Sequence, residues 1–462
     1  MRKLESFKRL ILLCLSGICL AGQIGIYAYY WYTSYYESVK VYLQFWERGH
    51  WLMIAIYGVL LFFFSNMYGG MRIGYLKNVE IIFSQLLATL IVGVITYGQI
   101  SLMVRWLFDV PTYVSMLVLQ AFWIIIWINI SSLLYKNMFP PRKLLLIHGD
   151  RPIEDILEKF KSRKDKFEVC KCMHIREGVE VIRKEALERY DAVVLWDISV
   201  ESRNQILKFC YGQSIRTYIM PKIPDVILKG AEELHLFDTP LLLTREYSLT
   251  IEQRFIKRCI DLVFALLLFV ITSPFMLLTA LAVKLYDGGP ILYKQVRCTV
   301  GGREFRILKF RSMRVDAEKD GVARLASKGD ARITPVGKFI RKVRLDELPQ
   351  LINIIKGDMS FIGPRPERPE IIARYQEVMP EFCYRMKVKA GLAGYAQVYG
   401  KYNTTPYDKL KLDLAYIENY SIWLDLKLML LTVKVLLWPD STEGVEDNQI
   451  TALKKEREDH GE

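Results

Sequence analysis

Long apolar stretches near the N-terminus give way to short alternating segments further along the chain. Four of these stretches contain no charged residue and are long enough to cross a bilayer, which takes roughly 17–25 residues. They cover residues 10–30, 51–68, 81–104 and 113–135. Tyrosine and tryptophan gather at the ends of the first two, where amphipathic rings prefer headgroup depth. We therefore predict a membrane protein with an N-terminal four-helix transmembrane bundle over residues 1–140.

Basic residues flank the four stretches unevenly. They precede the first stretch, separate the second from the third and follow the fourth, whereas the opposite loops carry only Lys40, Arg48 and Arg105. By the positive-inside rule, both ends of the bundle and everything after Lys136 face the cytoplasm. Since the stretches contain no charge, the pattern favours an anchor over a transport path.

Residues 141–248 alternate short apolar runs with charged helical segments, which is typical of a doubly wound, Rossmann-like α/β domain. The predicted strands are residues 144–147, 167–172, 192–196 and 217–220, and the predicted helices are residues 153–164, 178–190 and 201–211. A nucleotide-binding version places G-x-G-x-x-G after the first strand. Here that strand ends in His148-Gly149-Asp150, so the glycine cradle is missing. We favour structural or regulatory packing over cofactor binding.

A fifth uncharged stretch covers residues 262–283, but basic residues lie on both of its flanks. A crossing helix would put one basic cluster on the wrong side of the membrane. Ser273 and Pro274 lie at its middle, where proline removes a hydrogen bond and the serine hydroxyl can bond a freed carbonyl. We predict a re-entrant helix over residues 257–285 with a structural break at Ser273 and Pro274. The alternative is a kinked span that places the rest of the chain outside.

Composition narrows the function. The chain has 462 residues, of which 52% are apolar and 24% charged, and its formal net charge is +13. With long apolar runs, this excess points to anionic lipid headgroups or phosphorylated substrates rather than to nucleic acid. The eight cysteines are scattered and form no metal or disulfide pattern.

The densest chemistry follows the fifth apolar stretch. Residues 301–313 form a predicted turn and basic strand. Further on, Asp346 and Glu347 precede a predicted helix and are surrounded by Arg341 and Arg344. Acidic residues at a helix start are often ordinary caps. In this basic setting, however, we expect an ionised aspartate and a glutamate that helps to hold Mg²⁺, which accepts few protein ligands.

Residues 363–369, GPRPERP, fix two arginines on a stiff backbone, and arginine forks match phosphate oxygens. Cations, a carboxylate pair and a helix that dips into the membrane together indicate phosphoryl chemistry at the bilayer surface. On residue types and spacing alone, the inference ends there.

These motifs resemble those of the bacterial sugar transferases, the monotopic phosphoglycosyl transferases, over residues 252–438. In the family's order the chain has KR at 257–258, SP at 273–274, KFRSM at 309–313, LDELPQ at 345–350, KGDMS at 356–360, GPRP at 363–366 and GYAQV at 394–398. The segments ahead of them resemble the long subgroup, which starts capsule, exopolysaccharide or O-antigen repeat units. The resemblance implies transfer of a hexose 1-phosphate, glucose or galactose, from a UDP-sugar to undecaprenyl phosphate.

The resemblance also implies roles for individual residues. Asp346 matches the nucleophile, which forms a covalent phosphosugar intermediate, and Glu347 matches its partner in the dyad. The two carboxylates are the expected Mg²⁺ ligands. The expected substrate and phosphate ligands are Lys309, Arg311, Arg341, Arg365 and Gln397.

The resemblance places the catalytic domain at residues 249–439, mainly α-helical with amphipathic interfacial helices, on the cytoplasmic face of the bacterial inner membrane. Residues 422–438 are apolar but carry three charges, so we expect a helix in the interface, with a packed core helix as the alternative. Residues 440–462 form a charged tail that we expect to be disordered. A homodimer is compatible with this organisation, and no nucleic-acid partner is expected. A different class of function, an inactive membrane scaffold that binds a partner through its α/β domain, is disfavoured by the intact carboxylate pair.

Overall fold

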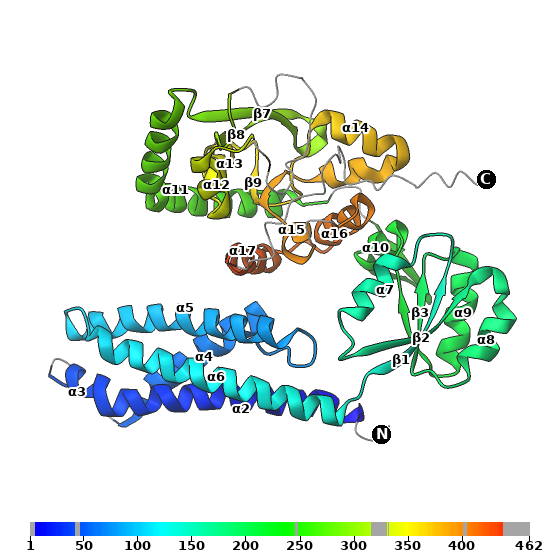
Figure 1. The fold of residues 1–462 in the computed structure, drawn as a ribbon, viewed down its shortest axis with the longest axis horizontal. Coiled ribbons are helices and arrows are strands. Elements are labelled where there is room, and N and C mark those ends of the chain that lie inside the picture. The colour runs from blue at the N-terminus through cyan, green and yellow to red at the C-terminus, as the bar shows by residue number, and fades with distance from the viewer. Residues whose placement is uncertain are drawn as a thin grey trace. The chain divides into compact units, whose positions relative to one another are not determined.

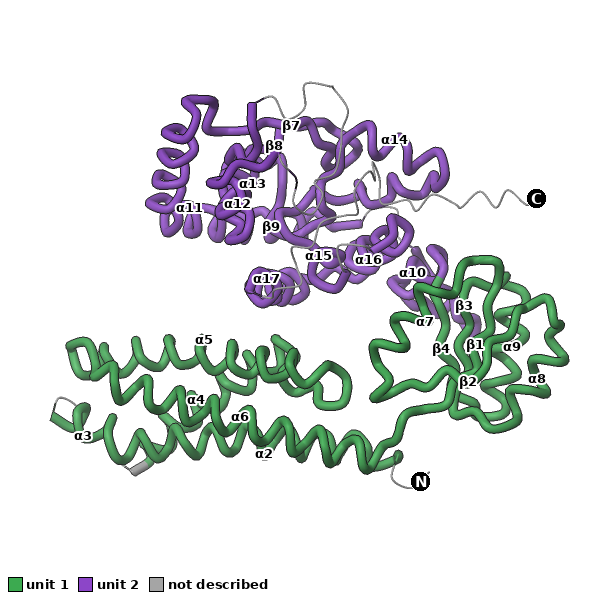
Figure 2. The backbone as a smooth tube through the Cα atoms, in the orientation of Figure 1, with its two compact units in different colours: residues 1–221 green, residues 222–462 purple. Residues whose placement is uncertain are grey.

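The computed structural model describes residues 5–41, 47–244, 248–315, 330, 332–400 and 404–437. It forms two compact units, Met1–Pro221 and Lys222–Glu462, which are coloured separately in Figure 2. The predicted tail, residues 440–462, lies outside the described residues.

The first unit begins with four long apolar helices that lie side by side (Figure 1). They are α2 (Lys8–Tyr30), α4 (Glu47–Tyr68), α5 (Asn78–Val104) and α6 (Val110–Met138), and α2 continues through the π-helical turn η1 (Trp31–Tyr35) into α3 (Tyr36–Val39). Helix α2 packs on α4 and α6, and α5 packs on the same two helices. Each is long and apolar enough to cross a membrane, as is α11 of the second unit. These helices are consistent with the predicted membrane protein.

Polar side chains inside the helical part pair with one another. Gln23 Nε2 donates to Gln85 Oε1 at 3.3 Å, and Gln120 Nε2 donates to the Tyr57 hydroxyl at 2.8 Å. The glutamines and Tyr57 are almost fully buried. Because each bond joins two different helices, the contacts fix how the helices are aligned.

The rest of the first unit is a parallel four-stranded sheet in the order β2-β1-β3-β4. Its elements are β1 (Arg142–His148), α7 (Glu154–Lys161), β2 (Phe167–His174), the 3₁₀ turn η2 (Ile175–Glu177), α8 (Val179–Ala186), β3 (Ala192–Trp196), α9 (Val200–Gly212) and β4 (Arg216–Ile219). Residues 144–147 of β1 are fully buried because the strand is central and both of its faces are covered. The alternation of strands and helices confirms the predicted α/β architecture.

The second unit starts earlier than the predicted domain boundary at residue 248. It includes α10 (Ile223–Lys229) and the hairpin of β5 (Glu232–Leu236) and β6 (Thr239–Leu243). Ile223 and Val226 of α10 join the main hydrophobic core of this unit. That packing accounts for the earlier boundary.

The second unit is mainly helical, with three two-stranded sheets. Beyond β6 its helices are α11 (Ile251–Asp287), α12 (Pro335–Lys342), α13 (Gln350–Lys356), α14 (Pro369–Val378), α15 (Tyr395–Tyr399), α16 (Pro406–Glu418) and α17 (Ile422–Leu436). Its further strands are β7 (Leu292–Cys298), β8 (Glu304–Phe310), β9 (Ser360–Ile362) and β10 (Gly391–Ala393). Short 3₁₀ segments are η3 (Val300–Gly302), η4 (Leu345–Glu347) and η5 (Pro380–Lys387).

Helix α11 is sharply bent, so that Figure 1 shows it as two arms. Pro274 has no N–H to donate to the carbonyl of Val270, four residues earlier. The Ser273 hydroxyl donates to that carbonyl at 2.8 Å instead. Proline and serine therefore act together, as predicted for a break in this helix.

Buried polar contacts attach the first arm of α11 to the core. Lys257 Nζ donates to Asp425 Oδ2 of α17 at 2.6 Å, and the Tyr416 hydroxyl donates to Asp425 Oδ1 at 2.7 Å. Leu428 of α17 is also buried, whereas Trp423 is about half exposed. One face of α17 therefore belongs to the core, and the other is apolar and exposed. Its place in the membrane interface stays a prediction.

Candidate active site

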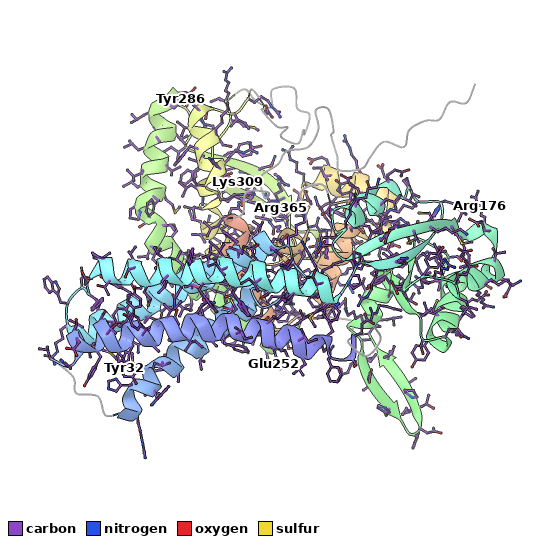
Figure 3. All side chains as sticks on the ribbon, turned by 60° about the horizontal axis from the view of Figure 1, so that its bottom comes forward. Tyr32, Arg176, Glu252, Tyr286, Lys309 and Arg365 are labelled. Carbon is purple, nitrogen blue, oxygen red and sulfur yellow. The ribbon has the colours of Figure 1, made fainter. Side chains whose placement is uncertain are left out.

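Three elements bring Lys309, Asp346, Glu347 and Arg365 together: the end of strand β8, the turn η4 and the segment after β9. Figure 3 labels Lys309 and Arg365. Asn353 of α13 ties the first two together. Its Oδ1 accepts a hydrogen bond from Leu308 N at 3.0 Å, and its Nδ2 donates to Arg306 O at 2.9 Å. The Asn353 side chain thus pairs with an N–H and a carbonyl of β8, as the backbone of a neighbouring strand would. These two bonds hold α13 beside the end of β8, where Lys309 lies.

Glu347 lies between two cations. Its Oε1 accepts from Lys309 Nζ at 2.9 Å and from Arg365 Nη2 at 3.0 Å. Burial alone would raise the pKa of Glu347, but the charges of Lys309 and Arg365 outweigh it and hold the pKa well below its usual range. The two cations therefore favour the ionised form of Glu347. We call Lys309, Asp346, Glu347 and Arg365 the dyad cluster.

Asp346 is 9% exposed, and its Oδ1 is buried without a hydrogen-bond donor among the described residues. Burial and the neighbouring Glu347 charge raise the pKa of Asp346, although Lys309, Arg341 and Arg344 oppose the shift. The sequence predicts an aspartate that is easily ionised in a positive field. The pKa is instead raised, first because Asp346 is buried and second because Glu347 places a negative charge beside it.

The two carboxylates lie in the turn η4, directly before α13, rather than inside a regular helix start. Arg344 begins this turn with a φ of 59°, in the left-handed region that non-glycine residues seldom adopt. Arg341 lies in the last turn of α12. Both arginine charges act on Asp346, so Arg344 joins Arg341 as a cation of the site.

Arg311 has different partners. Its guanidinium pairs with both carboxylate oxygens of Asp287 and donates through Nε to Pro290 O at 2.7 Å. These contacts join the end of β8 to the end of α11, and Arg311 is 7% exposed. We call Arg311, Asp287 and the Pro290 carbonyl the anchor. This geometry favours a structural role for Arg311 over the predicted phosphate binding.

Gln397 lies on the short helix α15, whose start packs tightly on the segment that carries Arg365. A Cβ on Gly394 would lie 2.2 Å from the Gly363 carbonyl oxygen, so the approach requires glycine. Gln397 Nε2 donates to Leu392 O at 3.4 Å. Its Oε1 is buried without a donor among the described residues. The amide is thus incompletely satisfied beside the Arg365 segment.

Asp346 and Glu347 offer the kind of oxygen ligands that a magnesium ion accepts. Within the described residues no cluster of three or more His, Cys, Asp or Glu side chains is present. Mg²⁺ does not need such a cluster, because it binds through one or two carboxylates together with substrate phosphates. The vacant Oδ1 of Asp346 is a suitable oxygen donor, and Glu347 is adjacent in the chain.

Comparison with known proteins identifies the second unit. Residues 252–439 match the family model of the bacterial sugar transferases. A UDP-N-acetylgalactosamine-undecaprenyl-phosphate N-acetylgalactosaminephosphotransferase of Aeromonas hydrophila is 39% identical over 258 residues, which are 54% of this chain and 59% of that protein. A UDP-glucose:undecaprenyl-phosphate glucose-1-phosphate transferase of Escherichia coli is 38% identical over 45% of this chain and 44% of its own length.

The chain therefore spans about half the length of these two relatives. A UDP-glucose:undecaprenyl-phosphate glucose-1-phosphate transferase of Caulobacter vibrioides is 42% identical over 190 residues, which are 40% of this chain and 71% of that protein. The family match covers the dyad cluster and the anchor alike. The chain belongs to the bacterial sugar transferase family.

Proposed function

We propose that this chain transfers a hexose 1-phosphate from a UDP-sugar to undecaprenyl phosphate, through a phosphosugar bound covalently to Asp346. The buried Oδ1 of Asp346, which accepts no hydrogen bond from the described residues, is the observation that supports this best. A carboxylate oxygen without a donor keeps its lone pairs available for attack on phosphorus. The names of the relatives describe the same class of reaction.

The proposed reaction has two displacements at one phosphorus. First, an Asp346 oxygen bonds to the phosphorus that carries the sugar, and the bond from that phosphorus to the bridging oxygen breaks. UMP leaves with the electron pair. Second, an oxygen of undecaprenyl phosphate bonds to the same phosphorus and the Asp346 carboxylate leaves. The product is a sugar linked to undecaprenyl diphosphate, and the free carboxylate is regenerated.

The surrounding residues supply position and charge, on which phosphoryl transfer mainly depends. Lys309 and Arg365 keep Glu347 ionised and fixed. Arg341 and Arg344 lower the cost of ionising Asp346 and offset charge on the incoming diphosphate. Asp346 and Glu347 would hold Mg²⁺, which when bound neutralises phosphate charge and polarises phosphoryl oxygens.

The proposal includes a place in the cell. Helices α2, α4, α5 and α6 would span the bacterial inner membrane as a four-helix bundle, and α11 would enter the cytoplasmic leaflet and return. The basic residues on both flanks of α11 and the break at Ser273 and Pro274 support this placement. The site would then face the cytoplasm, where nucleotide sugars are present, at the depth of the lipid phosphate.

The sugar is proposed to be glucose or galactose. The test uses the purified chain in nanodiscs with Mg²⁺, undecaprenyl phosphate and, separately, UDP-glucose, UDP-galactose and UDP-N-acetylgalactosamine. We expect UMP release with one donor and none from Asp346→Asn. Without the lipid acceptor, mass spectrometry should find the phosphosugar on the peptide that contains Asp346. No release with any donor, or equal release from Asp346→Asn, would favour a membrane scaffold instead.

A further inference from the structure

The segment that carries Arg365 is held through its backbone by two other arginines. Arg385 Nη2 donates to the Arg365 carbonyl at 3.0 Å, and Arg297 Nη1 donates to the Pro366 carbonyl at 3.1 Å. Arg385 comes from η5 and is 5% exposed. Two successive carbonyls of the segment are therefore occupied by guanidinium groups from other elements.

Two carboxylates balance these guanidinium groups. Asp413 Oδ2 of α16 lies 2.9 Å from Arg385 Nη2, and Asp413 is 1% exposed. Glu367 lies 3.7 Å from Arg385 Nη1 and 3.5 Å from Arg297 Nη1. Buried ion pairs seldom raise stability over apolar residues of similar size, because desolvation offsets their attraction. A network of this kind is better explained by the geometry that it fixes.

The network leads directly to the dyad cluster. Arg385 donates to the backbone carbonyl of Arg365, and the side chain of Arg365 donates to Glu347. Pro364 and Pro366 flank Arg365 and restrict its backbone further. The position of the Arg365 guanidinium therefore depends on where its backbone is held, and Arg385 is one of the groups that hold it.

We propose that Arg385, balanced by Asp413 and Glu367, is a positioning residue that directs Arg365 onto Glu347. Its effect on rate rests on the proposed transferase function. Arg385 contacts the backbone of Arg365 rather than the dyad carboxylates. In the folded chain, the effect of its loss on rate should therefore act through Arg365, and this distinguishes it from a residue that supports the fold in general.

A double-mutant cycle tests this relation. UMP release is measured for the full chain as wild type, Arg385→Met, Arg365→Met and the double variant. We expect each single variant to lose roughly 10- to 100-fold in rate and the double variant to be no slower than Arg365→Met, because residues that act as a unit are not additive. Multiplied losses in the double variant would overturn the proposal.

Arg254→Met is the matched control. Arg254 Nε donates to the Leu249 carbonyl at 3.0 Å, so this arginine also binds a backbone carbonyl of the same unit. Its effect should simply multiply with that of Arg365→Met. Arg385→Met leaves Asp413 with less compensation and can impair folding, so the cycle is repeated with Arg385→Met combined with Asp413→Leu, which removes one charge of each sign.

A second readout does not depend on activity. Arg365→Met should lower the melting temperature in the wild-type background, because it removes the ion pair with Glu347. In the Arg385→Met/Asp413→Leu background that decrease should be absent. An equal decrease in both backgrounds would overturn the positioning role. If the wild type releases no UMP from any UDP-sugar, the proposed function fails, and the melting temperatures still decide whether Arg385 positions Arg365.

Discussion

Lys309 and Arg311 lie two residues apart in the sequence, yet they belong to regions of opposite character. Lys309 belongs to the dyad cluster and Arg311 to the anchor. In both regions a buried or half-buried cation from the end of β8 pairs with a carboxylate. In the anchor both Asp287 oxygens pair with Arg311, which also binds the Pro290 carbonyl. In the dyad cluster one carboxylate oxygen, Asp346 Oδ1, has no donor within the part of the chain that the structure describes.

The difference shows how a structural ion pair can be told from a chemical site. In the anchor, the hydrogen bond from Arg311 lowers the pKa of Asp287 to about 2. In the dyad cluster two adjacent carboxylates are shifted in opposite directions, since the pKa of Glu347 is lowered and that of Asp346 is raised. Adjacent carboxylates whose pKa values are shifted in opposite directions are typical of sites where each carboxylate has a different task.

After the complete loss expected for Asp346→Asn, the largest effect is expected from Glu347→Gln. Glutamine has nearly the same shape but cannot neutralise Lys309 and Arg365, so the cluster loses its central charge. We expect UMP release to fall by on the order of 10³-fold. Glu304→Gln is the control, because Glu304 is an exposed glutamate on β8, the strand that carries Lys309. A Glu347→Gln rate close to that of Glu304→Gln would contradict the role of the dyad.

Arg311→Met and Lys309→Met should separate the two regions most directly. Arg311→Met breaks the contact between β8 and α11, so we expect the melting temperature to fall by several degrees. Its UMP release per folded molecule should stay within about threefold of wild type. Lys309→Met should show a large loss of rate per folded molecule, together with some decrease in melting temperature because it removes an ion pair with Glu347. A large loss of rate in folded Arg311→Met would return Arg311 to the phosphate ligands.

Local sequence patterns were enough to predict much of the fold and the residues of the dyad cluster. Apolar stretches free of charge predict the four N-terminal helices, and alternation predicts the parallel sheet. The motifs that contain Asp346, Glu347, Lys309 and Arg365 predict residues that the fold brings together. These features depend on neighbours in the chain, or on motifs that carry their own geometry.

Contacts between distant segments could not be predicted. The partners of Arg311 and Arg385 lie 24 and 28 residues away, at Asp287 and Asp413. A basic residue within a motif does not reveal whether its guanidinium faces solvent, substrate or a carboxylate from another element. The raised pKa of Asp346 has the same origin, since it depends on burial that the sequence does not specify.

The next effect concerns pH. Because the pKa of Asp346 is raised, its ionised fraction falls as pH decreases through that raised value, while Glu347 remains ionised. UMP release should therefore decline toward acid pH with a slope of up to about tenfold per pH unit. The decline should begin at a higher pH than an ordinary aspartate would give. A rate independent of pH down to the usual range of aspartate would contradict a nucleophilic Asp346.

The same two shifts predict opposite effects on stability. A raised native pKa means that the folded chain keeps a proton that the unfolded chain releases, so stability falls as pH rises through that window. Asp346→Asn should therefore raise the melting temperature at neutral pH but not below the usual aspartate pKa. Glu347 has a lowered pKa and contributes stability at neutral pH, which Glu347→Gln should remove. Melting temperatures without added metal, measured at pH 7.5 and at about pH 3, below the usual pKa of both side chains, test both signs.

The smallest effect is expected at the bend of α11, which lies between the core contacts of its first arm and the anchor at its end. Ser273→Ala leaves the Val270 carbonyl without the hydroxyl that replaces the missing Pro274 N–H. A hydrogen bond of this kind contributes about 1 kcal/mol, and at the membrane depth proposed for the bend no water could replace it. We expect a small decrease in melting temperature in nanodiscs. Ser273→Thr keeps a hydroxyl at the same position, so its melting temperature should stay close to that of the wild type. Equal decreases in Ser273→Ala and Ser273→Thr would show that the hydroxyl does not stabilise the bend.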